Sequence, residues 1–255
     1  MDKPTMTKTN FKGKTALVTG GARGIGHELT SQLVTHGAHV IAVGRNQSDL
    51  NKIHAEFGDQ VSTYQLDLTH PEEVTQFTQR VTSDHPGLSI LINNAGMQVE
   101  MDLFTDPYAS IAQPVFNEVA LNFVAPITLT AQLLPVLRTH RNALIINITT
   151  GLAIAPKEAS PVYCATKAGL RSFTQSLRYQ CQTSAPHIEV SEAIMTLVDT
   201  DMTSGRGKRK MSSHDAAVAI LKGASAGKPE IWIGKSALLP LLTRISPRLV
   251  RRILR

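Results

Sequence analysis

Cysteine, aromatic residues and long apolar runs are all scarce in this chain of 255 residues. Two cysteines, Cys164 and Cys181, are too few for a disulfide scaffold, which favours a reducing compartment. The longest apolar runs, such as residues 143–148 and 236–242, are far shorter than the roughly 20 residues that span a bilayer. Residues 1–11 are polar and unlike a signal peptide. These absences predict a cytoplasmic protein, and the histidines show no spacing typical of a metal site.

The composition fits one well-filled domain. With 42% hydrophobic and 18% charged residues, the chain can bury a sizeable core, which excludes a fibre or a disordered tail. A net charge of +6 and a pI near 9.4 favour anionic partners. A phosphate-bearing cofactor and a nucleic acid would both satisfy that preference, so charge alone does not choose between them.

Seven short apolar runs recur with helix-length segments between them. They are rich in β-branched residues and apolar on both faces, which is typical of a parallel sheet covered by helices on both sides. We therefore predict an α/β fold with a doubly wound, seven-stranded parallel sheet flanked by helices. The predicted strands are residues 15–19, 39–43, 61–65, 88–92, 143–148, 188–194 and 230–233.

Helix limits and domain limits are also predicted. Gly37 should end the first helix and Gly58 the second, while Thr69 should cap a helix that Pro71 opens. We expect residues 11–235 to form one domain that includes a substrate loop at 200–213. Residues 1–10 are predicted to be a flexible tail, and residues 236–255 a basic, amphipathic extension broken by two prolines.

A glycine-rich segment follows the first strand directly, at residues 19–26. Glycines let the backbone approach a pyrophosphate closely, and the free N–H groups of the next helix then face its charge. The pattern predicts a dinucleotide site rather than a simple tight turn, because it lies between a strand and a helix. The residues expected to contact the cofactor here are Gly20, Arg23, Gly24, Ile25 and Gly26.

No carboxylate follows the second strand, where one would bind the ribose hydroxyls of NAD. Arg45 and Asn46 stand there instead, and Arg45 with Arg23 could bind the 2′-phosphate of NADP, unless both are merely solvated. NADP(H) is therefore the preferred cofactor, with NAD(H) as the alternative. Further contacts are expected at the ends of the third and fourth strands, from Asp67, Leu68, Asn94, Ala95 and Gly96.

Four motifs together resemble the short-chain dehydrogenase/reductase (SDR) family in its compact single-domain form. They are residues 19–26, residues 93–96, Asn122 and residues 163–167. The resemblance covers roughly residues 11–235. Residues 149–153, 160–163 and 197–203 further resemble its bacterial DltE-like oxidoreductase branch. It implies a Rossmann fold and hydride transfer between the nicotinamide and a ketone or secondary alcohol. A catalytically silent NADP(H)-binding protein of the same fold is the alternative.

The chemistry of one residue pair agrees with this resemblance. Tyr163 and Lys167 are four residues apart, so a helix places them on one face. Lowering the pKa of a phenol by roughly three units requires about 4 kcal/mol of favourable charge interaction, and a neighbouring ammonium can supply much of it. The resemblance implies that Tyr163 exchanges a proton with the substrate oxygen. It also implies that Lys167 holds the nicotinamide ribose and that Asn122 supports a proton relay.

The sequence departs from the family pattern at two places. Thr150 stands where the family normally has a serine that orients the substrate, and its methyl group narrows the pocket while its hydroxyl can still bond a carbonyl. Strand alternation should point the neighbouring Thr149 to the other face. Met195-Thr196 replaces the usual Pro-Gly, ahead of Val198 and Thr200, which the resemblance places against the nicotinamide.

Two surface segments leave alternatives open. The loop at 200–213 is rich in glycine and positive charge, so it is either a lid for an anionic or carrier-linked substrate or a solvated loop. The C-terminal leucines and arginines could pack on a neighbouring subunit, which we favour, or lie on an anionic membrane. The resemblance implies a homodimer or homotetramer through long helices near residues 111–138 and 161–183. A nucleic-acid partner is not expected.

Overall fold

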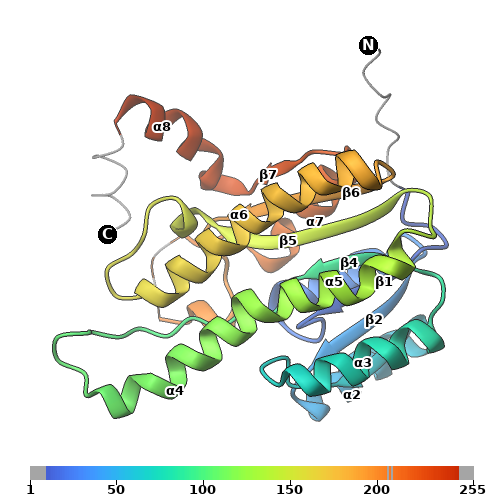
Figure 1. Cartoon of the computed structure of the whole chain (residues 1–255), viewed down its shortest axis with the longest axis horizontal. Helices are drawn as coiled ribbons and strands as arrows, with labels where there is room; N and C mark the ends of the chain where they lie inside the picture. The colour runs from blue at the N-terminus through green and yellow to red at the C-terminus, as the bar shows by residue number, and fades with distance from the viewer. Residues whose placement is uncertain (1–9, 206, 208, 247–255) are drawn as a thin grey trace.

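The computed structural model describes residues 10–205, 207 and 209–246 of the chain (Figure 1). It contains the predicted seven-stranded parallel sheet, in the order β3-β2-β1-β4-β5-β6-β7. Residues 1–9 of the predicted tail at 1–10, and most of the C-terminal arginines, lie outside the described residues. The strands are β1 Thr15–Thr19, β2 His39–Gly44, β3 Val61–Gln65, β4 Leu88–Asn93, β5 Ala143–Thr150, β6 Ile188–Met195 and β7 Glu230–Trp232.

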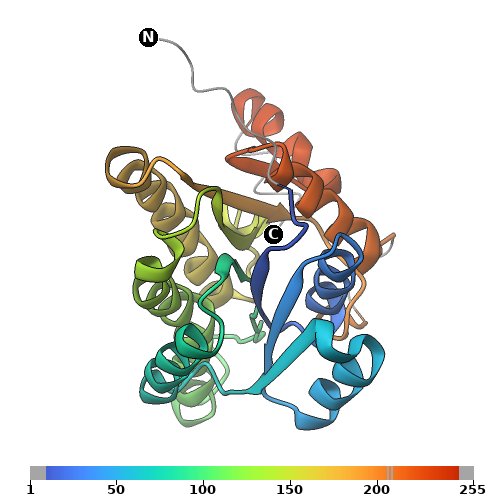
Figure 2. The ribbon, with the colours of Figure 1, turned by 90° about the vertical axis from the view of Figure 1, so that its right-hand side faces the viewer.

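Helices cover both faces of this sheet (Figure 2). Eight α-helices are described. The short 3₁₀ turns among the described residues are η1 Gly58–Gln60, η3 Gly151–Ala153, η4 Asp201–Thr203 and η5 Gly234–Leu238. The helices are α1 Gly24–Thr35, α2 Gln47–Phe57, α3 Pro71–Asp84, α4 Tyr108–Val119, α5 Ala125–Leu137, α6 Pro161–Ser184, α7 Ser213–Ser225 and α8 Leu239–Ile245. The arrangement is a doubly wound Rossmann fold, as predicted.

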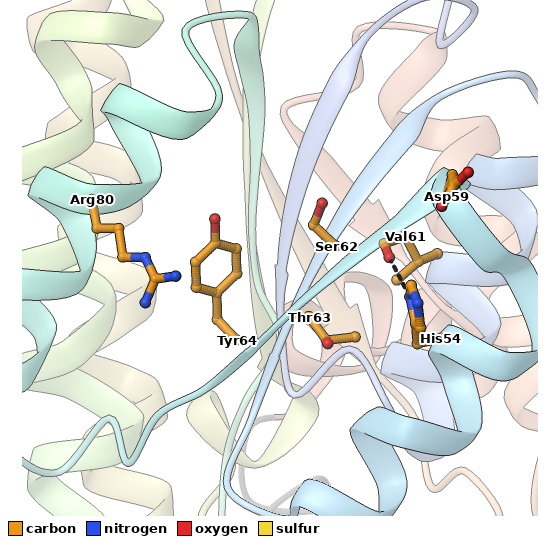
Figure 3. A pocket seen from close by; sticks show the side chains of 7 residues that line it. All are labelled: His54, Asp59, Val61, Ser62, Thr63, Tyr64 and Arg80. Carbon is orange, nitrogen blue, oxygen red and sulfur yellow. Dashed lines mark hydrogen bonds between the residues drawn. The ribbon is translucent and has the colours of Figure 1, made fainter.

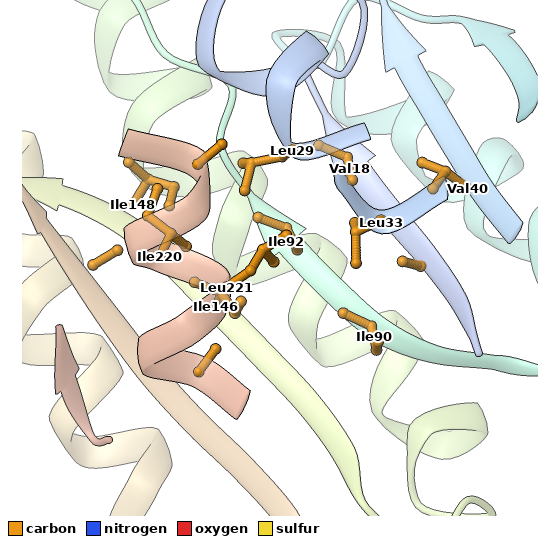
Figure 4. Packing of buried hydrophobic residues seen from close by; sticks show 14 of the residues in the cluster. Val18, Leu29, Leu33, Val40, Ile90, Ile92, Ile146, Ile148, Ile220 and Leu221 are labelled. Atoms are coloured by element: carbon orange, nitrogen blue, oxygen red, sulfur yellow. The ribbon is translucent and has the colours of Figure 1, made fainter. Parts of the chain in front are cut away.

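Alternate residues of each strand supply two separate cores. On one face, Val18 and Ile92 pack with Leu29 of α1 and Ile220 of α7 (Figure 4). On the other face, Leu17 and Leu91 join apolar residues of α3, α5 and α6. Because a strand turns successive side chains to opposite faces, central strands covered on both sides are mainly apolar on both faces. This explains why the strands could be predicted from short runs rich in apolar residues.

The predicted helix limits are partly confirmed. Gly37 follows α1 with a φ of 80°, and Gly58 is the C-cap of α2. The prediction that Thr69 caps α3 is wrong, because Pro71 is the first helical residue and His70 therefore occupies the capping position. The Thr69 hydroxyl instead donates to Asp67 Oδ1 at 2.8 Å.

One long helix, Tyr108–Leu137, combines α4 and α5 through a π-helical turn, η2, at Ala120–Val124. Pro126 has no N–H for the carbonyl of residue 122, and its ring crowds that carbonyl in a regular α-helix. A wider turn there relieves the clash. This helix is long enough, and with a mean hydropathy of 1.6 apolar enough, to cross a membrane. However, its second half, α5, buries Leu129, Leu133 and Leu137 against the sheet.

Candidate active site

The order of the strands reverses between β1 and β4, and the loops that follow these two strands are tied together. The Thr19 hydroxyl accepts hydrogen bonds from the N–H groups of Asn94 and Ala95 at 2.9 and 3.0 Å. The Asn94 amide returns a bond of 2.9 Å to the Thr19 carbonyl. Such a switch point is where open α/β sheets bind ligands, beyond the carboxyl ends of the strands.

The glycine-rich loop lies at this point and needs its glycines for space. A Cβ atom on Gly26 would lie 1.9 Å from the Gly20 carbonyl oxygen and 2.7 Å from Asn94 Nδ2. Gly20 and Gly24 have φ angles of 65° and 51°, which side chains rarely adopt. No side chain caps the start of α1, and its first turn carries no acidic residue. The N–H groups of that turn therefore suit a pyrophosphate.

The two predicted phosphate-binding arginines are exposed at the edge of this cradle. Arg23 Nε lies 3.4 Å from Asp49, and Arg45 Nη1 lies 3.9 Å from Asp67. Both side chains are more than 60% exposed, so these ion pairs are weak and leave the guanidinium groups accessible. Asn46 has a structural role that the sequence analysis did not identify, because its side chain caps α2 through the N–H groups of residues 48 and 49.

Asp67 is held ionised beside Arg45. Burial alone would raise the pKa of this carboxyl group, but hydrogen bonds from the Thr69 N–H and hydroxyl and the charge of Arg45 lower it on balance. A carboxylate here can accept a hydrogen bond from an adenine amino group. The Leu68 side chain is buried in the core, so only its backbone faces this end of the sheet.

At the reactive end, Lys167 is almost fully buried, with 4% of its surface exposed. Its Nζ donates to the Ile148 carbonyl at 3.0 Å. A Cβ atom on Gly96 would lie 3.4 Å from this Nζ and 3.2 Å from Asn122 Oδ1, so Gly96 leaves the two groups next to each other. Burial lowers the pKa of Lys167 to about 8, against an opposing effect of Glu118.

Asn122 lies inside the π-helical turn and is fully buried. Its amide exchanges two hydrogen bonds with the backbone of Met97, at 2.9 and 2.8 Å, and donates to the Thr166 hydroxyl at 3.3 Å. The turn and the proline that causes it were not predicted from the sequence. Pro126, four residues after Asn122, was the available signal.

Tyr163 is partly buried on the first turn of α6, one helical turn before Lys167. Thr150 is the last residue of β5, and its hydroxyl accepts a hydrogen bond of 3.3 Å from the Leu152 N–H. The proton of that hydroxyl is therefore still available to a substrate oxygen. Thr149 points the other way, as predicted, and donates to the buried carboxylate of Glu192.

The segment after β6 reaches the glycine-rich loop despite its unusual Met195-Thr196. Val198 is buried and forms a parallel bridge with Met211. Thr200 forms a reciprocal cap with Thr203, and its methyl group lies 3.3 Å from the position of a Cβ on Gly24. Local contacts thus hold both predicted nicotinamide-contacting residues in place, and Thr200 lies against the glycine-rich loop.

The proposed substrate loop is fastened at its base. Lys210 Nζ lies 3.2 Å from Asp199 and donates to the Thr203 carbonyl at 2.7 Å. Arg206 and Lys208, which contribute to its basic character, lie outside the described residues. Its role as a lid stays a prediction.

The described part of the C-terminal extension packs beside the active site. Leu239 of α8 is buried with Ala155, and a Cβ on Gly151 would lie 2.7 Å from its Cδ1. Gly151 directly follows Thr150, so α8 supports the loop that carries this hydroxyl. On the outer side of α8, Leu241 and Ile245 are exposed. A domain boundary at residue 235 stays a prediction.

A second hollow lies away from these groups. It follows the open edge of β3, with His54 on one side and Tyr64 and Arg80 on the other (Figure 3). None of the residues predicted to bind cofactor or substrate lines it. Across the described residues, no group of three or more His, Cys, Asp or Glu side chains could hold a metal ion.

Comparison with known proteins agrees with this geometry. The family model "short chain dehydrogenase" matches residues 14–211. The chain belongs to the short-chain dehydrogenase family. A relative from Bacillus subtilis, "Uncharacterized oxidoreductase DltE", is 35% identical over 230 residues, which are 85% of this chain and 86% of the relative. This family member is therefore an oxidoreductase.

Solved structures share the fold of this SDR chain. A short chain dehydrogenase from Burkholderia cenocepacia in complex with NADP has a TM-score of 0.83 at 24% identity, covering 96% of this chain and 99% of its own. An SDR from Burkholderia phymatum in complex with NAD also reaches 0.83, at 16% identity, covering 95% and 97%. The first of these two proteins is thus seen with NADP and the second with NAD.

Proposed function

We propose that this SDR protein is an NADP(H)-preferring oxidoreductase that transfers hydride between the nicotinamide and a ketone or secondary alcohol. The observation that carries the proposal is the buried ammonium of Lys167, one helical turn from Tyr163 and next to Asn122. A buried cation beside a phenol favours its ionised form, which a proton-exchanging tyrosine requires.

In the direction of reduction, Tyr163 donates its phenolic proton to the carbonyl oxygen of the substrate. The Lys167 ammonium stabilises the phenolate that remains, and Thr150 orients the carbonyl by a hydrogen bond. The cofactor, when bound, supplies the hydride to the carbonyl carbon. Asn122 fixes the backbone at Met97 and supports the relay that returns a proton to Tyr163. Oxidation of an alcohol uses the same groups in reverse.

The residues present suit a nicotinamide dinucleotide. Gly20, Gly24 and Gly26 leave room for the pyrophosphate at the start of α1, and Thr200 lies against that cradle. Val198 is buried in the segment that leads to Thr200. The absence of a carboxylate after β2 and the accessible Arg23 and Arg45 support NADP(H) over NAD(H). The remaining proposed cofactor contacts lie at the carboxyl ends of β2, β3 and β4. They are Asn46, Asp67, Leu68, Asn94, Ala95 and Gly96.

The cofactor assignment is tested by fluorescence titration of the purified protein with NADPH and with NADH. We expect tighter binding of NADPH, and Arg45→Ala should weaken it by about tenfold while NADH binding changes little. Arg141→Ala removes an exposed arginine that the proposal does not use, and it should bind both nucleotides as wild type does. Equal effects of the two variants would refute the role of Arg45.

The reaction is tested by following NADPH oxidation across a panel of ketones and aldehydes. Tyr163→Phe should lose at least about 10²-fold in kcat, because the proton donor is gone. Tyr179→Phe is a matched control on the same helix, with an exposed side chain, and should keep full activity. NADPH binding without any Tyr163-dependent turnover would favour the catalytically silent alternative.

We further propose that the protein is a homodimer or homotetramer in the cytoplasm. Phe116 and Val124 expose apolar surface along α4 and η2. Two free, buried cysteines agree with a reducing compartment. Light scattering after size-exclusion chromatography gives the subunit number, and a monomer at micromolar concentration would overturn this part.

A further inference from the structure

Glu118 is a fully buried carboxylic acid that no motif of the sequence analysis accounts for. It lies on α4 four residues before Asn122, so the helix turns both side chains toward the same side. Acidic side chains are rarely buried completely unless an opposite charge or hydrogen bonds compensate them. The surroundings of Glu118 therefore bear on the reactive end of the site.

Only one oxygen of this carboxyl group is hydrogen-bonded. Oε1 accepts from the Val99 N–H at 3.1 Å. Oε2 is buried without a hydrogen-bond partner among the described residues. A single hydrogen bond does not replace the hydration of a carboxylate, so Glu118 needs a further compensating interaction.

Two titratable groups of α6, Lys167 and Cys164, interact electrostatically with Glu118. Lys167 carries the positive charge. Its Nζ has a single described hydrogen bond, to the Ile148 carbonyl, so it also lacks a full set of partners. The two groups form no direct ion pair among the described residues, but their opposite charges attract each other. Each therefore reduces the cost of burying the other.

The pKa shifts of Glu118 and Lys167 agree with this mutual compensation. Burial raises the pKa of Glu118, and the Val99 N–H and the charge of Lys167 oppose that rise. Burial lowers the pKa of Lys167 to about 8, and Glu118 opposes that fall. The carboxylate thus helps Lys167 to remain an ammonium group at neutral pH.

We propose that Glu118 is a positioning residue that acts through Lys167, as the buried counter-ion that keeps this lysine protonated beside Tyr163. The proposal rests on the proposed function, since it concerns the same proton-exchanging pair. In this chain, Glu118 of α4 therefore helps to set the protonation of Tyr163 and Lys167 on α6.

The pH profile of carbonyl reduction tests this. In wild type, the rate should fall as pH rises through the pKa of Lys167. Glu118→Gln keeps the size and the Val99 hydrogen bond but removes the charge, so the falling limb should move down by about one pH unit. Glu118→Asp keeps the charge and should restore at least half of the shift. Glu72→Gln, at an exposed carboxylate of α3, should leave the profile unchanged.

A second measurement decides the question without turnover. Urea unfolding of wild type, Glu118→Gln, Lys167→Met and the double variant forms a double-mutant cycle. If the two charges compensate each other, the double variant should be more stable than the sum of the single effects predicts, by more than about threefold in the unfolding equilibrium constant. Additive effects would overturn the proposal even if a substrate is found. Coupling without activity would uphold the electrostatic interaction of Glu118 with Lys167 and reject only the proposed reaction.

Discussion

Gly26→Ala should destabilise this protein, although the residue lies in a helix. In a helix interior, alanine is normally about 1 kcal/mol more favourable than glycine. Here the new Cβ atom would lie 1.9 Å from the Gly20 carbonyl oxygen. That atom belongs to the backbone, so α1 and the glycine-rich turn must separate by ~1 Å, and such overpacking costs about 1–3 kcal/mol or more. We expect a net loss of about 2 kcal/mol in the free energy of unfolding.

The assay is urea unfolding followed by circular dichroism, with NADPH titration on the same samples. A loss of about 2 kcal/mol lowers the Tm by roughly 4–8 °C in a protein of this size. NADPH affinity should fall as well, because the N–H groups of α1 move. Gly87→Ala is the control, since its Cβ would meet only Thr15 Oγ1 at 3.5 Å. A Gly26→Ala protein as stable as wild type would refute the close-approach argument.

Three further predictions concern the reactive end. Thr150→Ser should keep most of the activity, whereas Thr150→Val should lose about 10²-fold in kcat, because only the hydroxyl orients the carbonyl. Since the pKa of Lys167 is lowered to about 8, kcat for reduction should fall about tenfold for each pH unit above that value. A kcat that does not change between pH 8 and pH 10 would contradict the role of the Lys167 ammonium. Leu239→Ala should cost about 2–4 kcal/mol in urea unfolding, since it empties a buried contact on Gly151.

The sequence was most informative where one physical constraint acts alone. Central strands covered by helices on both faces are rich in apolar residues, and all seven strands were predicted with ends within about two residues. Close contacts require glycine at fixed positions after β1, so the glycine-rich motif can be recognised in the sequence. Capping was less predictable, because Pro71 and Thr69 each offer a helix start and only the fold selects His70 as the cap.

Contacts between distant segments could not be predicted in this way. The burial of Glu118 depends on the path of residues 97–101, which run between α4 and the loop before α6. Nothing in the local sequence of α4 distinguishes a buried glutamate from a solvated one. The packing of α8 on Gly151 likewise joins residues far apart in the chain.

The π-helical turn at Ala120–Val124 fixes the rotational phase between the two halves of the long helix. Each residue of an α-helix advances by about 100° around its axis. Removing one residue from the turn would therefore rotate α4 against α5 by roughly that angle. Asn122 could then no longer face Met97 while Leu129 stays in the core on the sheet. The length of this helix is consequently much less free to vary than that of the surface loops.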